Sequence, residues 1–517
     1  MRQYKFNKNI QLGVLIFTIL AICFSCQNIL DEQPQSEIGP KDFWKNNTDA
    51  ESGIIGMYDA MQPAYRVAHF LWGEFRSDSY KLAQDGAPID YKELVLQNIT
   101  SGNRETLKWD NLYELINRAN TAIKYIPQIT AYNESLLAEA HAARAFAYFD
   151  AIRVWGSVPL FTEPTESVAD LQKSRTPGDQ ILNEVIIPDM LKAESIIGPP
   201  TSDFRFSKSS ILCLQAEVYM WMKDYPKAKE AIEKMIALGG HSLVTSVQAW
   251  QDLFSNTPQT ADTPDGRGKI QTGPELIFSI RFDLAEDEDN PGQRLANRSG
   301  VYRLFYAGIP SFYISDSLNV KWTRRFPTEQ AEWDAKYPGV QPAVTTSTGP
   351  LYGDWRYFAS RQGRFDGFEG NALVAKWNYD NFSPVQDDTD IVLYRYAGML
   401  LMLAEAENQL NADGIRALEI LNQLRSARLL PQVTMAEFGL TQEDRENYLL
   451  DERQFELLGE GKRWWDLRRT DKAIEILNPI LSEIPEASIL TEDRLLFPIY
   501  FEHLDENPNL LPQNTGY

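Results

Sequence analysis

A repeating pattern of small and aromatic residues at helical spacing constrains the fold of this chain more than any other feature. It is clearest from Leu212 to Leu238, where Ala216 and Tyr219 in one predicted helix are followed by Ala228 in the next. The tripeptide Asp224-Tyr225-Pro226 predicts the turn between them. These offsets match a tetratricopeptide unit, a helix pair that usually serves as a scaffold for binding. An ordinary all-helical core is the alternative.

The same periodicity recurs along the chain and predicts a mainly α-helical fold. From Glu134 to Trp155 the apolar face is rich in alanine, which lets another helix approach closely, and Gly156 predicts the end of this helix. A second, more degenerate helix pair is predicted at Ile391 to Gln409 and at Ile415 to Arg428. Two further helices are predicted at Thr48 to Met61 and at Leu107 to Tyr125.

Composition excludes several classes of function. The 517 residues carry a formal net charge of −22, and a surface this acidic repels phosphate backbones, so we expect no nucleic-acid partner. The four histidines and three cysteines form no zinc-binding pattern, and we expect no metal and no cofactor. The length alone suggests about three domains, but a helical repeat array folds as one unit.

The N-terminal residues are typical of an export signal. Three basic residues, the last of them Lys8, precede an apolar stretch from Leu12 to Phe24 that is too short to span a membrane. The following Ser25 and Cys26 resemble the lipobox of bacterial lipoproteins, so Cys26 is the predicted lipidation site. An ordinary cleaved signal is the alternative. After cleavage Cys213 is the only other thiol, so no internal disulfide is expected.

These features predict the organisation of the chain. A lipoprotein signal peptide is predicted at residues 1–25, a polar, proline-containing tether at 26–40 and a single folded domain at 41–517. Within the domain we expect a helical scaffold at 41–243 and 389–517 and a loop-rich insertion at 244–388 that faces the ligand.

The insertion is rich in Gly, Pro, Thr, Asp and aromatic residues, and it contains short β-like runs such as Glu275 to Phe282. Aromatic faces stack on sugar rings while polar neighbours bond the hydroxyl groups, so this cluster indicates sugar binding. For any single aromatic residue, packing in the core is the favoured alternative. The aromatic residues are Trp250, Tyr302, Phe305, Tyr306, Phe312, Tyr313, Trp322, Trp333, Tyr337, Tyr352, Trp355, Tyr357, Phe358, Phe365 and Phe368.

Several stretches resemble the SusD/RagB family of Bacteroidetes outer-membrane lipoproteins. The most specific are Leu450 to Arg469 (LDERQFELLGEGKRWWDLRR) and Leu496 to Tyr517 (LFPIYFEHLDENPNLLPQNTGY). Gly398 stands where the family usually has an acid. The other stretches that carry the resemblance are Cys26 with Leu30-Asp31 and Pro34, Asp42-Phe43-Trp44, Asp49-Ala50, Asn117 to Asn120, Ala143 to Ala145, Gly156 to Leu160, and Tyr394 to Ala397 with Leu401 and Ala404 to Ala406.

The resemblance implies a helical, tetratricopeptide-containing protein that is anchored at the cell outer membrane by the lipid on Cys26. It implies a lid over a SusC-like TonB-dependent transporter, to which the protein presents oligosaccharide or polysaccharide, and no enzymatic activity. A peptide- or glycopeptide-binding member of the family, a surface glycoside hydrolase and a purely structural lid are the alternatives.

The charged residues in Leu450 to Arg469 are spaced by three or four, so we expect opposite charges to face each other on one helix, with Trp464 and Leu467 packed inward. We interpret them as a structural network rather than a catalytic pair. The acidic run Asp283 to Asn290 lacks the spacing of a calcium-binding loop and is interpreted as solvated. The charged residues meant in Leu450 to Arg469 are Arg453, Glu456, Glu460, Arg463 and Asp466.

The family has no common signature for its ligand contacts. The resemblance implies that loops from two regions border the sugar site, the segment after the first helix and the insertion. The candidate ligand-binding residues are Asp78, Tyr80, Lys81 and Tyr91 in the first region and Trp322, Trp333, Tyr352 and Trp355 in the second.

Overall fold

A computed structural model describes residues 43–83, 88–165, 167–200, 202–255, 271–282, 299–305, 312–361, 371–377 and 389–517. The predicted signal peptide, the tether and the acidic run at 283–290 lie outside these residues. The organisation into scaffold and insertion therefore stays a prediction.

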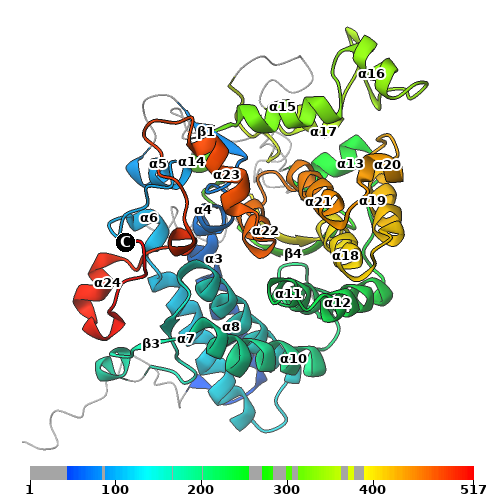
Figure 1. Ribbon diagram of the computed structural model, residues 1–517. Helices are drawn as coiled ribbons and strands as arrows, with labels where there is room; N and C mark the ends of the chain where they lie inside the picture. Colours follow the sequence, from blue (N-terminus) through cyan, green and yellow to red (C-terminus); the bar gives the residue numbers. More distant parts are fainter. Residues whose placement is uncertain are drawn as a thin grey trace, which may run out of the picture.

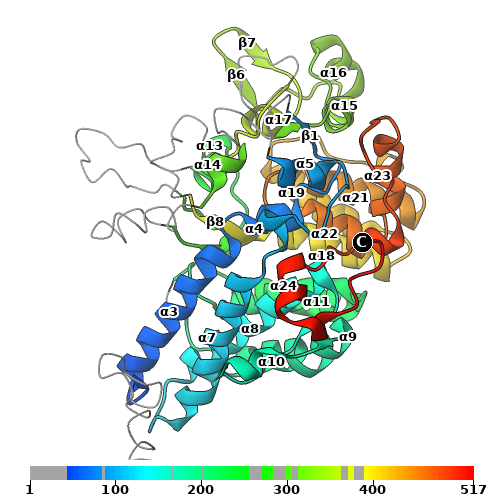
Figure 2. The same cartoon turned by 90° about the vertical axis from the view of Figure 1, so that its left-hand side faces the viewer.

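The fold is mainly helical, as predicted, and its larger helices stack in antiparallel pairs (Figure 1). The repeat predicted at 212–238 is a helix pair, α11 and α12, and α12 packs in turn on α18 of the second predicted pair. Helices α3, α7 and α8 run side by side next to them (Figure 2). The α-helices before the insertion are α3 (Asn47–Tyr65), α4 (Ala68–Gly73), α5 (Ile89–Val95), α6 (Arg104–Leu107), α7 (Asp110–Tyr125), α8 (Glu134–Trp155), α9 (Gly178–Ile181), α10 (Ile187–Ile196), α11 (Lys208–Trp221) and α12 (Tyr225–Leu238).

Helix α8 has the predicted bounds because both of its ends are specified locally. The Asn133 side chain accepts a hydrogen bond from the Ser135 backbone, which caps the first turn, and Gly156 ends the helix at a positive φ of 76°. Its alanines are buried, and the small side chains let α7 and α10 pack against it on two sides.

The insertion carries short helices and strands between the two helical parts. They are α13 (Val247–Asp252), α14 (Val301–Phe305), α15 (Asp316–Arg325), α16 (Gln330–Lys336) and α17 (Trp355–Ala359), with β4 (Leu276–Ile280), β5 (Phe312–Ile314), β6 (Val344–Thr346) and β7 (Gly349–Leu351). The strands in the rest of the described chain are β1 (Tyr80–Leu82), β2 (Val158–Pro159), β3 (Arg175–Thr176) and β8 (Ile391–Arg395). The α-helices after the insertion are α18 (Tyr396–Leu410), α19 (Ile415–Ala427), α20 (Met435–Phe438), α21 (Gln442–Glu456), α22 (Arg463–Arg469), α23 (Ala473–Leu481) and α24 (Phe501–Glu506).

One helix prediction was wrong at its start. Residues 391–395, expected as the first turn of a helix, form strand β8, which pairs antiparallel with β4 inside the β-like run predicted at 275–282. All ten residues of the two strands are buried. A strand buried on both faces has no alternation of polar and apolar residues. In the sequence its short apolar run is therefore indistinguishable from the first turn of the helix that follows.

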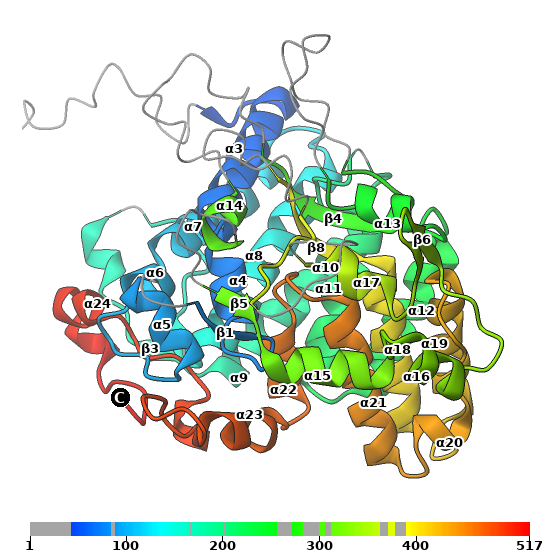
Figure 3. The ribbon, with the colours of Figure 1, turned by 90° about the horizontal axis from the view of Figure 1, so that it is seen from above.

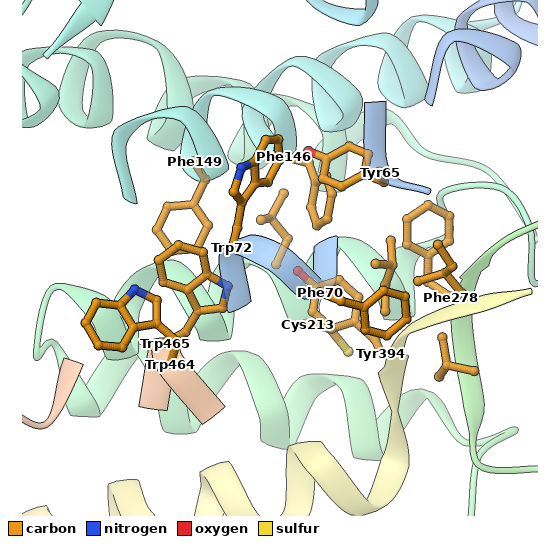
Figure 4. Packing of buried hydrophobic residues seen from close by; sticks show 14 of the residues in the cluster. Tyr65, Phe70, Trp72, Phe146, Phe149, Cys213, Phe278, Tyr394, Trp464 and Trp465 are labelled. Carbon is orange, nitrogen blue, oxygen red and sulfur yellow. The ribbon is translucent and has the colours of Figure 1, made fainter. Parts of the chain in front are cut away.

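The hydrophobic core joins segments from both ends of the chain (Figure 4). The Tyr65 and Phe146 rings pack with centroids 5.2 Å apart, and Phe146 also contacts Tyr394 of β8 at 6.3 Å. Cys213 is buried and free, and burial raises the pKa of its thiol. The labelled side chains come from α3 (Tyr65), α4 (Phe70, Trp72), α8 (Phe146, Phe149), α11 (Cys213), β4 (Phe278), β8 (Tyr394) and α22 (Trp464, Trp465).

The segment predicted as one charged helix at 450–469 is broken. Helix α21 ends at Glu456 and α22 begins at Arg463, and between them Gly459 and Gly461 adopt positive φ values of 78° and 71°. Arg453 and Asp466 therefore pair across the break, at 2.8 Å, and along a single helix Asp466 pairs with Arg469 in α22, also at 2.8 Å. Trp464 and Leu467 are fully buried, as predicted.

Most partners of these charges come from other elements, and they form one buried network. Glu456 accepts hydrogen bonds from Arg356 of α17 at 2.6 Å, Arg395 of β8 at 2.7 Å and Arg428, just after α19, at 2.8 Å. Glu460 pairs with Arg395 and with Lys376. All of these side chains are at most 3% exposed. The predicted structural network is thus confirmed, with partners that join the insertion to the scaffold.

At Gly73 the backbone of α4 lies close to the segment between α21 and α22, and a substitution at this position tests that contact. A Cβ atom at position 73 would overlap the carbonyl oxygen of Gly461 and lie 2.7 Å from the Trp465 ring nitrogen. We expect Gly73→Ala to lower the free energy of unfolding by about 1–3 kcal/mol, measured by urea denaturation. Gly102→Ala is the matched control, because its Cβ would meet only Thr100, at 3.6 Å. Equal stability of the two variants contradicts the packing described.

The network predicts loss of stability in acid. Burial alone raises the pKa of Glu452, but the charges of Arg425 and Arg356 lower it to about 2, and Arg453 and Arg469 lower that of Asp466 to about 2 against the same effect of burial. Both values lie below those of the unfolded chain. The stabilisation is therefore complete above pH ~4.5 and is lost as the pH falls towards 2.

We expect the melting temperature, followed by circular dichroism, to fall over this pH range. Glu452→Gln should cost about 3–5 kcal/mol at neutral pH, because it leaves the buried Arg425 without its charge partner and removes one of the three acids that pair with Arg356, and it should make the acid decline shallower. An unchanged acid decline in the variant would contradict this origin of the stability.

Candidate functional site

Strands β1 and β5 form a two-stranded ribbon that brings together the two regions predicted to border the ligand (Figure 3). In the antiparallel register Tyr80 faces Ile314 and Lys81 faces Tyr313. Side chains alternate between the two sides of a strand, so Tyr80 and Ile314 point into the core while Lys81 and Tyr313 share the outer side. A lysine from the N-terminal part and a tyrosine from the insertion thus lie side by side and half-buried.

An aspartate completes this outer surface. Lys81 Nζ donates to both carboxylate oxygens of Asp316, at 2.7 and 2.8 Å, and the Asp316 side chain is 72% exposed. Asp316 is fixed at the start of α15, where the Ser315 hydroxyl accepts a hydrogen bond from the Leu318 backbone. We call Lys81, Tyr313 and Asp316 the ribbon patch. It offers an aromatic ring, a cation and a carboxylate to one ligand.

Asp78 lies beneath this patch and holds it in place. Its carboxylate accepts hydrogen bonds from Arg463 at 2.8 and 3.0 Å and from Lys321 at 3.2 Å, and its carbonyl oxygen accepts one from Ser315 at 2.6 Å. Burial acts to raise the pKa of Asp78, but Arg463 and Lys321 hold it well below the usual range. Asp78 is therefore a buried anion that fixes the ribbon against α15 and α22.

Two further candidates support the ribbon from inside. The Tyr80 hydroxyl donates to Glu74 at 3.0 Å, and the Tyr91 ring packs on Phe312 of β5 at 5.7 Å. Both tyrosines are at most 4% exposed. Burial raises the pKa of Tyr91 to about 12. As placed, neither ring presents a face to a ligand.

Three of the four candidates in the insertion are also core residues. The ring N–H of Trp322 donates to Asp354 at 2.9 Å, that of Trp333 to the carbonyl oxygen of Val340 at 2.8 Å, and that of Trp355 to a carbonyl oxygen after α19 at 2.6 Å. Each side chain is at most 2% exposed. All three are packed as the core alternative expects, with buried rings and bonded ring nitrogens, and their role in ligand binding stays a prediction. Tyr352 remains half-buried, 6.4 Å from the Trp333 ring.

The structure thus leaves Lys81 and Tyr352 as predicted candidates with accessible surface, and their role stays a prediction. It adds Tyr313, an aromatic residue of the insertion that was not among the eight. Its exposure follows from the strand register with Lys81, and the sequence gives no signal for a pairing between segments so far apart. Within the described ranges no group of three or more His, Cys, Asp or Glu side chains is placed to hold a metal ion.

No helix among the described residues is long and apolar enough to cross a membrane.

Comparisons with known proteins agree on one family. A model described as "SusD family" matches residues 343–517, and one described as "Starch-binding associating with outer membrane" matches 28–220. Among curated relatives, SusD-like protein P38 of Formosa agariphila is 42% identical over 523 residues, covering 99% of each chain. SusD-like protein P2 of the same organism is 26% identical over 549 residues and covers all of both chains.

Solved structures share the fold. A "Laminarin binding SusD-like protein" superposes with a TM-score of 0.67 at 20% identity, covering 92% of this chain and 100% of that one. The surface glycan-binding protein A of Bacteroides thetaiotaomicron, in complex with laminarihexaose, gives 0.66 at 19% identity over 91% of this chain and 100% of that one. With a relative 42% identical along nearly its whole length, the chain belongs to the SusD family.

Proposed function

We propose that this protein binds oligosaccharide or polysaccharide at the cell surface and delivers it to a SusC-like TonB-dependent transporter in the outer membrane. The ribbon patch is the observation that carries the binding role. A half-buried tyrosine lies across the strands from a lysine, which is paired with an exposed aspartate. Ring stacking combined with charged groups that bond hydroxyls is the chemistry that sugars require.

Family membership supports the rest of the proposal. Two members of the same fold carry names that mention laminarin or a laminarin oligosaccharide, so a β-glucan of this type is the first ligand to test. The description "associating with outer membrane" of the N-terminal family model supports location at that membrane, with Cys26 as the lipidated residue. The pairing of the buried carboxylates around Glu456 with arginines makes these groups poor acids or bases and supports binding without bond cleavage.

The ribbon patch and Tyr352 predict the effect of removing a stacking ring. We expect Tyr313→Ala and Tyr352→Ala each to weaken glycan binding about fivefold, because one ring contributes about 1 kcal/mol. Binding is measured by calorimetry with laminarihexaose and by native gels containing laminarin and a panel of other polysaccharides. Tyr132→Ala, a half-buried tyrosine between α7 and α8, is the control and should bind as the parent does.

Several outcomes would redirect this assignment. Unchanged affinity of both variants for a glycan that the parent binds would remove the ribbon patch and Tyr352 from the site. If no polysaccharide is retarded but peptides bind, the peptide-binding alternative replaces the glycan one. Release of new reducing ends during incubation would favour a glycoside hydrolase.

Lipidation at Cys26 predicts membrane association of the mature protein. We expect Cys26→Ser to move the protein from the outer-membrane fraction to the soluble or secreted fraction and to abolish incorporation of labelled palmitate. Cys213→Ser is the control, because that thiol is buried. Palmitate incorporation into the Cys26 variant would place the anchor elsewhere.

A further inference from the structure

A cavity of about 770 Å³ lies between the first turns of α7 and the C-terminal helix α24. It lies apart from the ribbon patch, since α24 and α15 are well separated in two views (Figures 1 and 2). Its floor is apolar, formed by Tyr113, Ile116, Phe161 and Leu510. The size is that of pockets that hold small molecules or a few residues of a peptide.

The walls of this cavity are fixed by hydrogen bonds. On one side Gln172 donates to the carbonyl oxygen of Glu506 at 3.1 Å, and Asn507 donates to that of Lys173 at 2.9 Å. On the other side the backbone N–H of Thr165 donates to Asn117 at 2.9 Å. Because both walls are held by contacts within the protein, a ligand would meet a preformed site.

The mouth of the cavity exposes apolar side chains. Leu171 lines it and is 47% exposed. Two exposed apolar residues are near lining residues in the sequence: Leu511, 59% exposed, follows Leu510, and Phe501, 44% exposed, begins α24, which contributes His503 and Glu506 to the lining. Exposed apolar residues on the elements that form a hollow are typical of a surface that binds another protein.

The charges around the mouth are acidic. Asp110 and Glu506 are exposed, line the cavity and form no ion pair with the described residues, whereas Glu114 is paired with Arg118 at 2.6 Å. Among the described residues the cavity lining contains no lysine or arginine. Two lysines lie near its margin: Lys108 is paired with Glu502 at 3.3 Å, while Lys173 donates to the carbonyl oxygen of Leu160 at 3.0 Å and keeps its charge 4.5 Å from the centroid of the Phe161 ring. A cationic group of a ligand is therefore favoured next to Asp110 and Glu506, away from Lys173.

The aromatic residues of the cavity are poorly suited to a sugar. One face of Trp109 is covered by His503, with the rings parallel and 4.8 Å apart, and its ring is only 7% exposed. The Tyr113 hydroxyl already donates to the carbonyl oxygen of Pro159 at 2.7 Å. Trp109 and Phe161 are at most 9% exposed, which leaves the half-buried Tyr113 ring as the main surface for stacking, so the floor suits an aliphatic or aromatic side chain better than a run of pyranose rings.

We propose that this cavity docks a peptide segment of a protein partner, with an apolar side chain inside it and an adjacent lysine or arginine facing Asp110 and Glu506. The proposal is independent of the glycan-binding role, because the two surfaces share no residue.

Selection of displayed random peptides on the full mature chain tests this proposal. The selected peptides should pair a large apolar residue with Lys or Arg, and their affinity, measured by fluorescence anisotropy, should fall as salt is added. We expect Glu506→Lys to weaken binding about fivefold or more, while Asp505→Lys, the same charge change at an exposed neighbouring residue of α24 outside the lining, leaves it unchanged.

A second pair of variants tests the apolar part. Leu171→Asp should weaken binding about tenfold, while Leu191→Asp, at a leucine of α10 with 44% exposure, should not. The proposal is overturned if the selected peptides lack basic residues, if Glu506→Lys and Asp505→Lys bind alike, or if no peptide is selected. Displacement of a bound peptide by glucose oligomers would make the cavity a saccharide site instead.

Discussion

Glu456 lies without solvent contact among the guanidinium groups of Arg356, Arg395 and Arg428. These arginines come from α17, from β8 and from the end of α19, segments that are distant from α21 in sequence. Removing charges from water costs several kcal/mol per ion, so the arrangement is favourable only when every partner is in place. Helix α17, strand β8, the end of α19 and helix α21 are therefore parts of one cooperative structure, and the position of each depends on the others.

Buried charge pairs also support the outer surface of the molecule. Arg463, just beyond the break after α21, holds Asp78, and Gln454 of α21 donates to Ser79 at 3.0 Å, so the ribbon rests on buried charged and polar contacts. Above it Lys81 is restrained by Asp316. A ligand would meet side chains whose freedom is already limited, which lowers the entropic cost of binding.

Local patterns in the sequence predicted the features that depend on neighbours along the chain. The bounds of α8 followed from its alanine face and from Gly156, and the helix pair α11–α12 followed from its repeat. The patterns failed where contacts with distant segments determine whether a side chain is buried. Trp322 belongs to the core because Asp354 accepts its ring N–H and Phe455 stacks on it at 4.8 Å, and no local signal reports either contact. For the same reason aromatic composition indicated a region for the site but not its residues.

The position of the charge network along the chain has a consequence for biosynthesis. Its central acids, Glu452, Glu456 and Glu460, lie in the last part of the polypeptide, whereas Arg356 and Arg395 emerge from the ribosome earlier. Until these acids follow, Arg356 has only Asp354 and Arg395 only Glu275 as a buried acidic partner, so placing the arginines in the interior is less favourable. A product that ends before residue 452 carries Arg356, Arg395 and Arg428 without the three acids that complete their pairing, and its arginine-bearing segments are expected to stay open to water.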